Sequence, residues 1–225
     1  MPDATTKERL LDAGWALLAE HEGDLAYLKM QSVTRKAGLS SGAFYSNWAS
    51  LREFHADLLR HAYGDEREQH SIDLRQSIDD ALIGPNGPEE KDLGVFVRRI
   101  ADTDFDALRR GPTFKLWMAL WAAHASVPEA AEVIKKGYAD TDRRWSQTFE
   151  RILKAYGREV RPPFTPESLS IVFTALLEGL LLRDGVDRDA TMIANGADTV
   201  TLFGEVLVAL LPVLSDEVGA GATDS

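Results

Sequence analysis

Apolar side chains recur every three or four residues through almost the whole sequence. This spacing places them along one face of an α-helix, whereas no segment shows the convincing apolar–polar alternation of a half-buried strand. Glycine and proline interrupt the pattern, most clearly at residues 84–88, and such interruptions separate helices. The sequence therefore predicts an all-α fold of about nine helices.

The interruptions give approximate bounds for these helices. The first is expected to begin at Thr5 and to end near Gly23, because Thr5 and Glu8 have the spacing of an N-terminal capping box. Ser50 and Glu53 repeat that spacing at the start of a longer helix. The other helices are expected at 30–37, 41–48, 90–109, 113–125, 129–156, 167–183 and 189–214.

The residue types limit the chemistry that the chain can perform. It has no cysteine, which excludes disulfides, thiolate metal sites and cysteine nucleophiles. Its five histidines are too scattered for a zinc-binding helix motif. The sequence has neither a phosphate-binding glycine loop nor a serine in a nucleophile elbow. We therefore expect no enzyme, no cofactor and no metal.

Nothing in the sequence favours a membrane. The amino-terminal residues lack the basic stretch and apolar stretch of a secretory signal. The most apolar segment, residues 169–182, is interrupted by Ser170, Thr174 and Glu178 and is too short to favour a membrane span. We expect a cytoplasmic protein, which agrees with the lack of cysteine.

The distribution of charge along the chain indicates more about a nucleic-acid partner than the net charge does. A net charge of −11 argues against nucleic acid as a partner, because phosphate contacts usually require a basic surface. Residues 26–55, however, carry a net charge of +3. A modest basic patch on an acidic body is what a DNA-binding domain attached to a sensor domain would present.

The segment Ala37-Gly38-Leu39-Ser40 has the parts of a helix-turn-helix. Gly38 can adopt the positive φ that ends a helix, and Ser40 can cap the next helix. Leu39 can pack inward, and Ala37 is small where two helices would approach closely. The turn predicts two short helices, the second of which can enter the major groove of DNA.

The surrounding sequence resembles the DNA-binding domain of the tetracycline-repressor (TetR) family. The resemblance covers residues 8–59 and is carried by Leu11, Ala13, Leu17, Leu18, Val33, the run from Ala37 to Tyr45, Trp48 and Ser50. It implies a bacterial transcriptional regulator with a DNA-binding domain at 1–50 and a joining helix at about 50–82. A ligand-binding and dimerisation domain at 83–214 and a disordered tail at 215–225 complete the expected organisation.

The resemblance also implies which residues meet DNA. The expected contacts are Lys29, Ser40, Ser41, Gly42, Ala43, Tyr45, Ser46 and Asn47. The chemistry suits these roles, because Gly42 and Ala43 let the helix approach the bases, and Asn47 can offer a donor–acceptor pair to adenine. Tyr45 is expected at the phosphate backbone, with packing on the first helix as the alternative. Phe44 and Trp48 are expected in the core.

The chain departs from the family pattern at three positions. Lys29 stands where the family usually begins a helix with threonine, so a cap is lost and a phosphate-seeking charge is gained. Thr34 stands where alanine is usual. Leu51 stands where a lysine usually grips phosphate, and Arg52 points about 100° away from it.

The second half of the chain concentrates aromatic side chains at helical spacing. They could line a mostly apolar pocket for a hydrophobic or aromatic effector, and ordinary core is the alternative for each of them. The candidates are Phe114, Trp117, Trp121, His124, Tyr138, Trp145, Phe149 and Phe173. Asp102 and Asp104 could pair with a cationic effector, although solvated acids are the commoner explanation.

The last two helices are apolar over more than one face, so each needs both its own core and a partner chain. The resemblance implies that they form a four-helix bundle in a homodimer that binds a palindromic operator. The expected interface residues are Leu169, Phe173, Leu176, Leu180, Val200, Phe203, Leu207 and Leu211.

The resemblance implies a ligand-responsive repressor that a small hydrophobic or aromatic effector releases from double-stranded DNA. Activation in place of repression stays open. The alternative is a dimeric ligand-binding protein with little DNA affinity, which the acidic body and Leu51 would favour.

Overall fold

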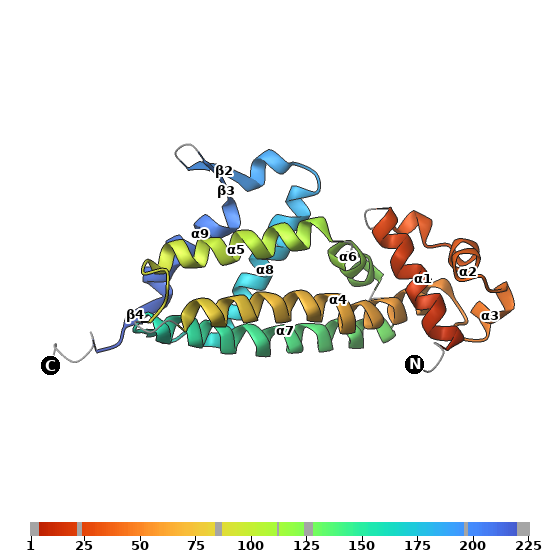
Figure 1. Ribbon diagram of the computed structural model, residues 1–225, viewed down its shortest axis with the longest axis horizontal. Coiled ribbons are helices and arrows are strands. Elements are labelled where there is room, and N and C mark those ends of the chain that lie inside the picture. Colours follow the sequence, from red (N-terminus) through yellow and green to blue (C-terminus); the bar gives the residue numbers. More distant parts are fainter. Residues whose placement is uncertain are drawn as a thin grey trace. The chain divides into compact units, whose positions relative to one another are not determined.

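The computed structural model describes residues 5–21, 24–83, 87–111, 113–123, 128–195 and 198–219. Nine α-helices lie within these ranges, which confirms the predicted all-α fold (Figure 1). They are α1 Thr6–Glu20, α2 Met30–Ala37, α3 Ser41–Tyr45, α4 Leu51–Leu82, α5 Leu93–Arg110, α6 Thr113–Ala123, α7 Pro128–Ala155, α8 Pro166–Asp184 and α9 Leu202–Leu214.

The chain forms two compact units. The first unit consists of Met1–His70 and Arg110–Tyr138, and the second of Ser71–Arg109 and Ala139–Ser225. Helices α4 and α7 each contribute residues to both units. The first unit therefore holds α6 and the start of α7 together with the helix-turn-helix, a division that the sequence does not indicate.

Hydrogen bonds from side chains fix where the helices begin. At α1 the predicted capping box is present: the Glu8 amide donates to Thr5 Oγ1 at 3.2 Å, and the Thr5 amide donates to Glu8 Oε2 at 2.7 Å. At α4 the Glu53 amide donates to Ser50 Oγ at 3.2 Å, as predicted. The Glu53 carboxylate accepts from the amide of Ala49 instead of Ser50.

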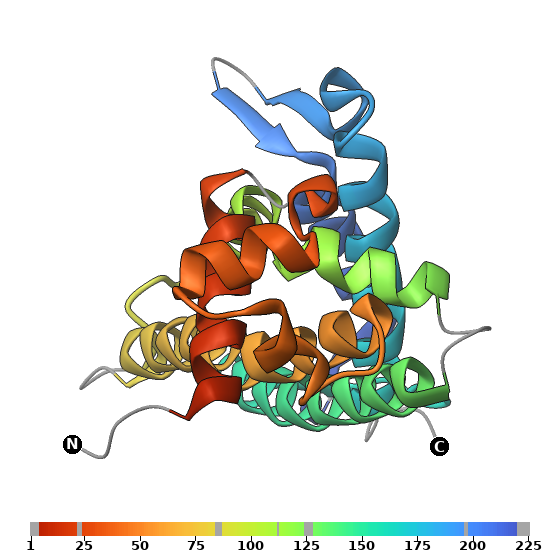
Figure 2. The same ribbon diagram turned by 90° about the vertical axis from the view of Figure 1, so that its right-hand side faces the viewer.

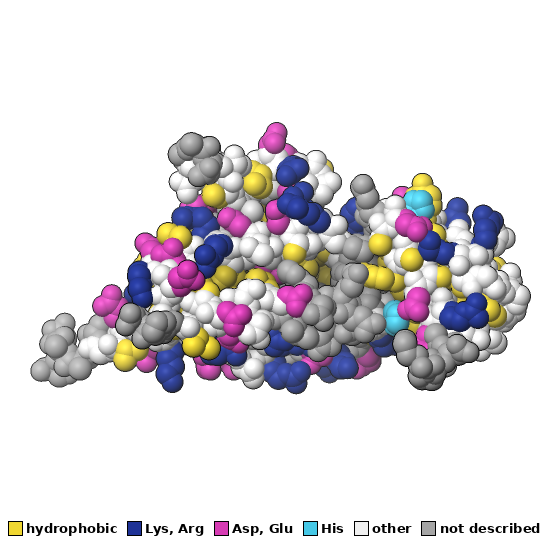
Figure 3. All heavy atoms as spheres, viewed as in Figure 1, with side chains coloured by type: hydrophobic (Ala, Val, Ile, Leu, Met, Phe, Trp, Pro, Cys, Tyr) yellow, Lys and Arg dark blue, Asp and Glu magenta, His cyan; other side chains and the backbone are white. Residues whose placement is uncertain are grey.

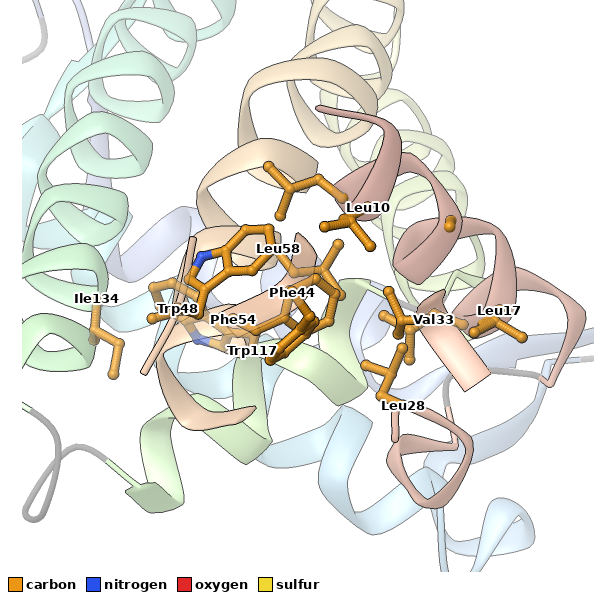
Figure 4. Close-up of a cluster of buried hydrophobic side chains, with 14 residues drawn as sticks. Leu10, Leu17, Leu28, Val33, Phe44, Trp48, Phe54, Leu58, Trp117 and Ile134 are labelled. Carbon is orange, nitrogen blue, oxygen red and sulfur yellow. The ribbon is translucent and has the colours of Figure 1, made fainter. Parts of the chain in front are cut away.

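An apolar core holds the first unit together (Figure 4). Leu10 and Leu18 of α1, Val33 of α2, Phe44 of α3 and Phe54 of α4 are all at most 1% exposed. Because the short helices α2 and α3 could not persist alone, this shared core is what stabilises them.

The same core receives side chains from later in the chain. Trp117 of α6 is 1% exposed and Ile134 of α7 is 8% exposed, and both belong to this cluster. The Trp117 ring meets the Tyr138 ring edge-on, with centroids 5.1 Å apart.

The second unit has a core of its own between α4, α5 and α7. Ile78, Phe96 and Ile152 are each at most 4% exposed and lie in one cluster. The Tyr156 hydroxyl donates to the Glu90 carbonyl at 2.7 Å and ties the end of α7 to the segment before α5.

The helix predicted at 189–214 is only partly correct, because its first half is not helical. A 3₁₀ turn at Arg188–Thr191 leads into an antiparallel hairpin of β2 Met192–Asn195 and β3 Asp198–Thr201, and α9 begins only after it. Figure 2 shows this hairpin extending from the helices of the second unit. The β-branched residues Ile193, Thr199, Val200 and Thr201 favour strands, and this preference outweighs the helical spacing.

The tail expected to be disordered from Ser215 begins as an ordered strand. β4 Ser215–Glu217 pairs antiparallel with β1 Arg158–Val160. Arg158 donates from Nε to Ser215 Oγ at 2.8 Å, and Arg161 donates to Asp216. These long-range partners of the basic side chains are invisible in the local sequence.

None of the helices in the described ranges is long and apolar enough to cross a membrane.

The half-buried His55 makes the stability of the first unit depend on pH. Its Nε2 lies 3.4 Å from the Leu28 carbonyl oxygen. Burial lowers the pKa of His55, and the contact with Leu28 only partly opposes this shift. The unfolded chain therefore binds a proton more readily, so the contribution of His55 is complete above its ordinary pKa of about 6.5 and is lost as the pH falls below it.

We expect the unfolding temperature to fall between about pH 7.5 and about pH 5. It should fall less steeply in His55→Gln, which cannot titrate there but keeps a donor. Thermal unfolding followed by circular dichroism across this range is the measurement. An identical pH dependence in the two proteins would contradict the assignment.

Candidate nucleic-acid interface and ligand cavity

The turn between α2 and α3 has the predicted construction. Gly38 ends α2 in the left-handed region with φ 66°, and the Leu39 amide donates to the Thr34 carbonyl at 2.9 Å. Ser40 caps α3, its Oγ accepting from the Ala43 amide at 3.3 Å. The local sequence thus fixes both the end of α2 and the start of α3.

Helix α3 has one buried face and one exposed face. Phe44 is 1% exposed and the following Trp48 is 3% exposed, as predicted for core residues. Ser41, Gly42 and Ser46 are exposed, Ala43 is half-buried, and Tyr45 is 59% exposed. The Tyr45 ring contacts Phe44 edge-on with centroids 5.7 Å apart, so it packs on α3 itself while its hydroxyl end remains accessible.

Two polar side chains at the end of α3 bond to their own helix. Ser46 Oγ donates to the Ala43 carbonyl at 2.9 Å, and Asn47 Nδ2 donates to the same oxygen at 2.8 Å. Asn47 is half-buried. The donor–acceptor pair expected for adenine is therefore available only if the Asn47 amide leaves this bond.

The three departures from the family pattern have physical explanations. Lys29 is exposed at the start of α2 and forms no side-chain cap, as the sequence predicts. Thr34 is 5% exposed, and its Oγ1 donates to the Met30 carbonyl at 3.0 Å, so its buried hydroxyl is satisfied. Leu51 packs half-buried against the core of the first unit.

Asp57 connects three segments of the first unit. It accepts from Trp48 Nε1 at 2.8 Å, forms an ion pair with Lys7 of α1 at 2.7 Å, and forms a second ion pair with Arg60. Lys7 also lies over the Trp48 ring, 5.7 Å from its centroid. Sequence reasoning missed this residue, since the partners Lys7 and Trp48 are distant from Asp57 in the sequence and give no local signal of such a role.

Basic residues gather on the part of the first unit that carries α2 and α3. Lys29, Arg35, Lys36 and Arg52 are exposed there, and dark blue side chains mark this region in Figure 3. Lys36 is paired with Glu20 at 2.6 Å, which reduces the local excess of positive charge.

The second unit contains an apolar cavity between α5, α7, α8 and α9. Three of its four aromatic lining residues contact one another: Trp145 and Phe149 are stacked with centroids 5.5 Å apart, and Phe173 meets Phe149 edge-on at 5.2 Å. The fourth is Phe203. Leucine and isoleucine side chains complete most of the lining, together with Asp104, Ser170, Thr174 and Ser215.

The structure brings together only some of the expected ligand residues. Trp145, Phe149 and Phe173 line the cavity. Trp117 and Tyr138 belong to the core of the first unit. An ordinary core position was the alternative expected for each of them. Phe114 is half-buried and Trp121 is 49% exposed in that same unit, and His124 lies outside the described residues.

The two acids considered on α5 differ in their surroundings. Asp102 accepts from both the amide and the hydroxyl of Thr201, the residue that caps α9. A Cβ at Gly204 would lie 2.8 Å from Asp102 Oδ1, so glycine permits this close approach of α9 to α5. Asp104 is 8% exposed and lines the cavity.

Most residues expected at a dimer interface lie inside the second unit. Leu169, Phe173, Phe203, Leu207 and Leu211 line the cavity. Leu176 and Leu180 are half-buried on α8, and Val200 lies half-buried in β3.

The exposed apolar side chains of α8 are different residues. Ile171 is 57% exposed, Val172 47% and Leu182 53%. The sequence indicates that α8 is apolar on two sides but not which side faces inward.

Comparison with known families decides the identity of the fold. Residues 96–201 match a TetR C-terminal family model described as BetI-type transcriptional repressor, C-terminal. The match begins beyond the segment that carries the helix-turn-helix motif, so two separate parts of the chain indicate the same family. Residues 96–201 therefore belong to the TetR C-terminal family.

Solved structures agree with this TetR fold. The reduced form of NemR from E. coli is 17% identical, with 96% of this chain and 100% of that chain covered and a TM-score of 0.57. A regulator from Mesorhizobium loti, assigned to the TetR family, is 12% identical, with 82% and 85% covered and a TM-score of 0.59.

A third structure was solved with a ligand. This transcriptional regulator from Saccharomonospora viridis, in complex with choline, is 14% identical, with 94% and 98% covered and a TM-score of 0.58. At such identities the likeness shows the fold alone. A comparison with curated proteins found no match.

Two glycines of the helix-turn-helix provide a matched test of the turn. Gly38→Ala would force an L-residue into the left-handed region, which costs roughly 1–2 kcal/mol. Gly42→Ala meets nothing closer than Ser40 Oγ at 3.6 Å and lies within a helix, where alanine is favoured over glycine. We expect urea unfolding to show a loss of stability in the first variant and none in the second. Equal losses would contradict the conformation of the turn.

Proposed function

We propose that the protein is a ligand-responsive transcriptional repressor that binds a palindromic operator as a homodimer and is released by a small, mostly apolar effector. The observation that carries the proposal is the exposed face of α3. Ser41, Gly42 and Tyr45 are presented on it by the Gly38 turn, in a chain whose residues 96–201 match a repressor domain.

The exposed face of α3 suits the major groove. Gly42 is exposed and has no side chain, so the helix backbone can come close to the base edges. The accessible Tyr45 hydroxyl and the Lys29 ammonium can bond to phosphates, which positions the helix without reading sequence. Asn47 would contribute to base reading once its amide turns away from the Ala43 carbonyl.

A homodimer would cover the exposed apolar face of α8. Ile171, Val172 and Leu182 lie on that face, and burying them against a second copy would remove apolar surface from water. A two-fold dimer would offer two α3 helices to two half-sites, spaced by a whole number of DNA turns.

The cavity in the second unit is the proposed effector site. Ligand binding would favour a dimer state whose α3 helices are wrongly spaced for DNA, provided that the ligand binds the two states unequally. Helix α4 contributes residues to both units and would carry the change.

A second candidate function is ligand binding with little DNA affinity. It is favoured by Leu51, which packs on the core where the family usually places a phosphate-binding lysine, and by the net charge of −11. Activation of transcription in place of repression would use the same DNA-binding surface.

Selection of random duplex DNA on the purified protein, near physiological salt, tests the proposal. We expect one palindrome to be enriched. Tyr45→Phe should weaken binding to that palindrome by on the order of tenfold, because a hydrogen bond to a charged phosphate is lost. The matched control Tyr156→Phe removes a tyrosine hydroxyl in the second unit and should leave DNA affinity unchanged.

Enrichment of no motif by a folded dimer would contradict the repressor proposal and favour the ligand-binding alternative. Equal losses in the two tyrosine variants would contradict the role of α3.

A further inference from the structure

Helix α3 presents its smallest residue near the centre of its exposed face. Gly42 and Ser46 are exposed and stand one helical turn apart. Because a helix turns by about 100° per residue, both lie on the side of α3 roughly opposite Phe44, which is 1% exposed. An α3 helix that enters the major groove with this face therefore brings Gly42 and Ser46 nearest to the base edges.

The polar groups around Gly42 are bonded within the helix. The Ser46 amide donates to the Gly42 carbonyl at 3.0 Å, and Ser46 Oγ donates to the Ala43 carbonyl at 2.9 Å. Asn47 Nδ2 donates to the Ala43 carbonyl as well, at 2.8 Å. Since a hydroxyl has one hydrogen, Ser46 Oγ can only accept a hydrogen bond from a base while this bond persists.

The α3 segment carries few side chains that read bases through paired hydrogen bonds. Arginine and lysine read guanine in this way, and asparagine and glutamine read adenine. Residues 39–47 contain none of these except Asn47, whose amide is engaged with its own helix. Apolar contact with the 5-methyl group of thymine requires neither a donor nor an acceptor, only a surface that comes close to the base.

Folding does not require glycine at position 42. Its backbone is helical, and a Cβ placed there would lie 3.6 Å from its nearest neighbour, Ser40 Oγ, which is an ordinary van der Waals distance. Alanine is moreover favoured over glycine within a helix. Neither backbone conformation nor packing within the first unit therefore accounts for this glycine, whereas close approach to DNA does.

We propose that Gly42 determines operator specificity, because its missing side chain leaves room for the 5-methyl group of one thymine in each half-site. This role of Gly42 rests on the proposed function, in which α3 of each subunit enters the major groove. Contact of this kind discriminates thymine from cytosine, since cytosine has no methyl group.

Replacement of thymine by deoxyuridine in the selected palindrome removes only the methyl group. Each thymine position is replaced in turn, in both half-sites at once, and the affinity of the full-length protein is measured by fluorescence anisotropy. We expect replacement at one position to weaken binding about 10- to 20-fold, because each buried methyl group contributes about fourfold and the dimer reads two half-sites. If no position changes the affinity by more than about twofold, the proposal is wrong.

The variant Gly42→Ala tests whether this methyl group lies at Gly42. The added methyl group would occupy the same space, so affinity for the thymine operator should fall by at least about tenfold. The variant should bind the operator that carries deoxyuridine at the sensitive position more tightly than the thymine operator, which reverses the wild-type preference. A variant that still prefers thymine would overturn the assignment to Gly42.

The variant Gly185→Ala provides the matched control. A Cβ at Gly185 would also lie 3.6 Å from its nearest neighbour, the Leu182 carbonyl oxygen, but Gly185 belongs to the second unit. This variant should keep the wild-type preference for thymine, and a reversed preference in both variants would overturn the assignment. The deoxyuridine series on the wild-type protein stands even if Gly42→Ala fails to fold.

Failure of this inference can be told apart from failure of the proposed function. Enrichment of no palindrome in the selection would overturn both. Enrichment of a palindrome in which deoxyuridine leaves the affinity unchanged at every thymine position would overturn the role of Gly42 alone. A palindrome whose half-sites consist only of G·C pairs would have the same consequence.

Discussion

The position of α3 depends on the packing of three aromatic rings. Phe44 lies within 5.2 Å, centroid to centroid, of both Trp48 and Phe54, and those two rings meet edge-on at 5.0 Å. A five-residue helix has no stability of its own, so this contact with α4 keeps it in place. The bond from Trp48 Nε1 to Asp57 fixes the same junction from its polar side.

In the second unit, the contact between α5 and α9 holds a helix in place in the same way. Asp102 bonds to Thr201, and Gly204 allows α9 to approach α5 closely. Arg98 and Glu205 form an ion pair at 2.6 Å across the same contact. Because α9 supplies Phe203 and Leu207 to the cavity, these polar bonds determine where one wall of the ligand site stands.

Local sequence signals predicted the helix-turn-helix well. Gly38 and Ser40 determine the turn through backbone conformation and capping, which are properties of adjacent residues. Residues 192–201 have apolar side chains at helical spacing, but their β-branched residues favour strands, so the helix predicted there is wrong. The partners of Asp57 and Arg158 are distant in sequence, so no local pattern could indicate them.

The cavity was predictable only in part. Trp145, Phe149 and Phe173 were expected in it and line it. Trp117 belongs to an aromatic stripe of the same helical spacing but lies in the core of the other unit. An aromatic stripe shows that a helix is buried without showing what it is buried against. For the same reason the inward and outward faces of α8 could not be distinguished before the structure.

The salt dependence of DNA binding tests most directly the central claim, that the first unit engages the phosphates of DNA. Each neutralised phosphate contributes about 0.9 to the slope of log affinity against log salt. Lys29 of each subunit would neutralise one phosphate, so affinity of a dimer for the selected palindrome should fall by at least about tenfold between about 50 and 200 mM salt. A change of less than about threefold over this range would contradict the account, because no phosphate-tracking surface would then be engaged.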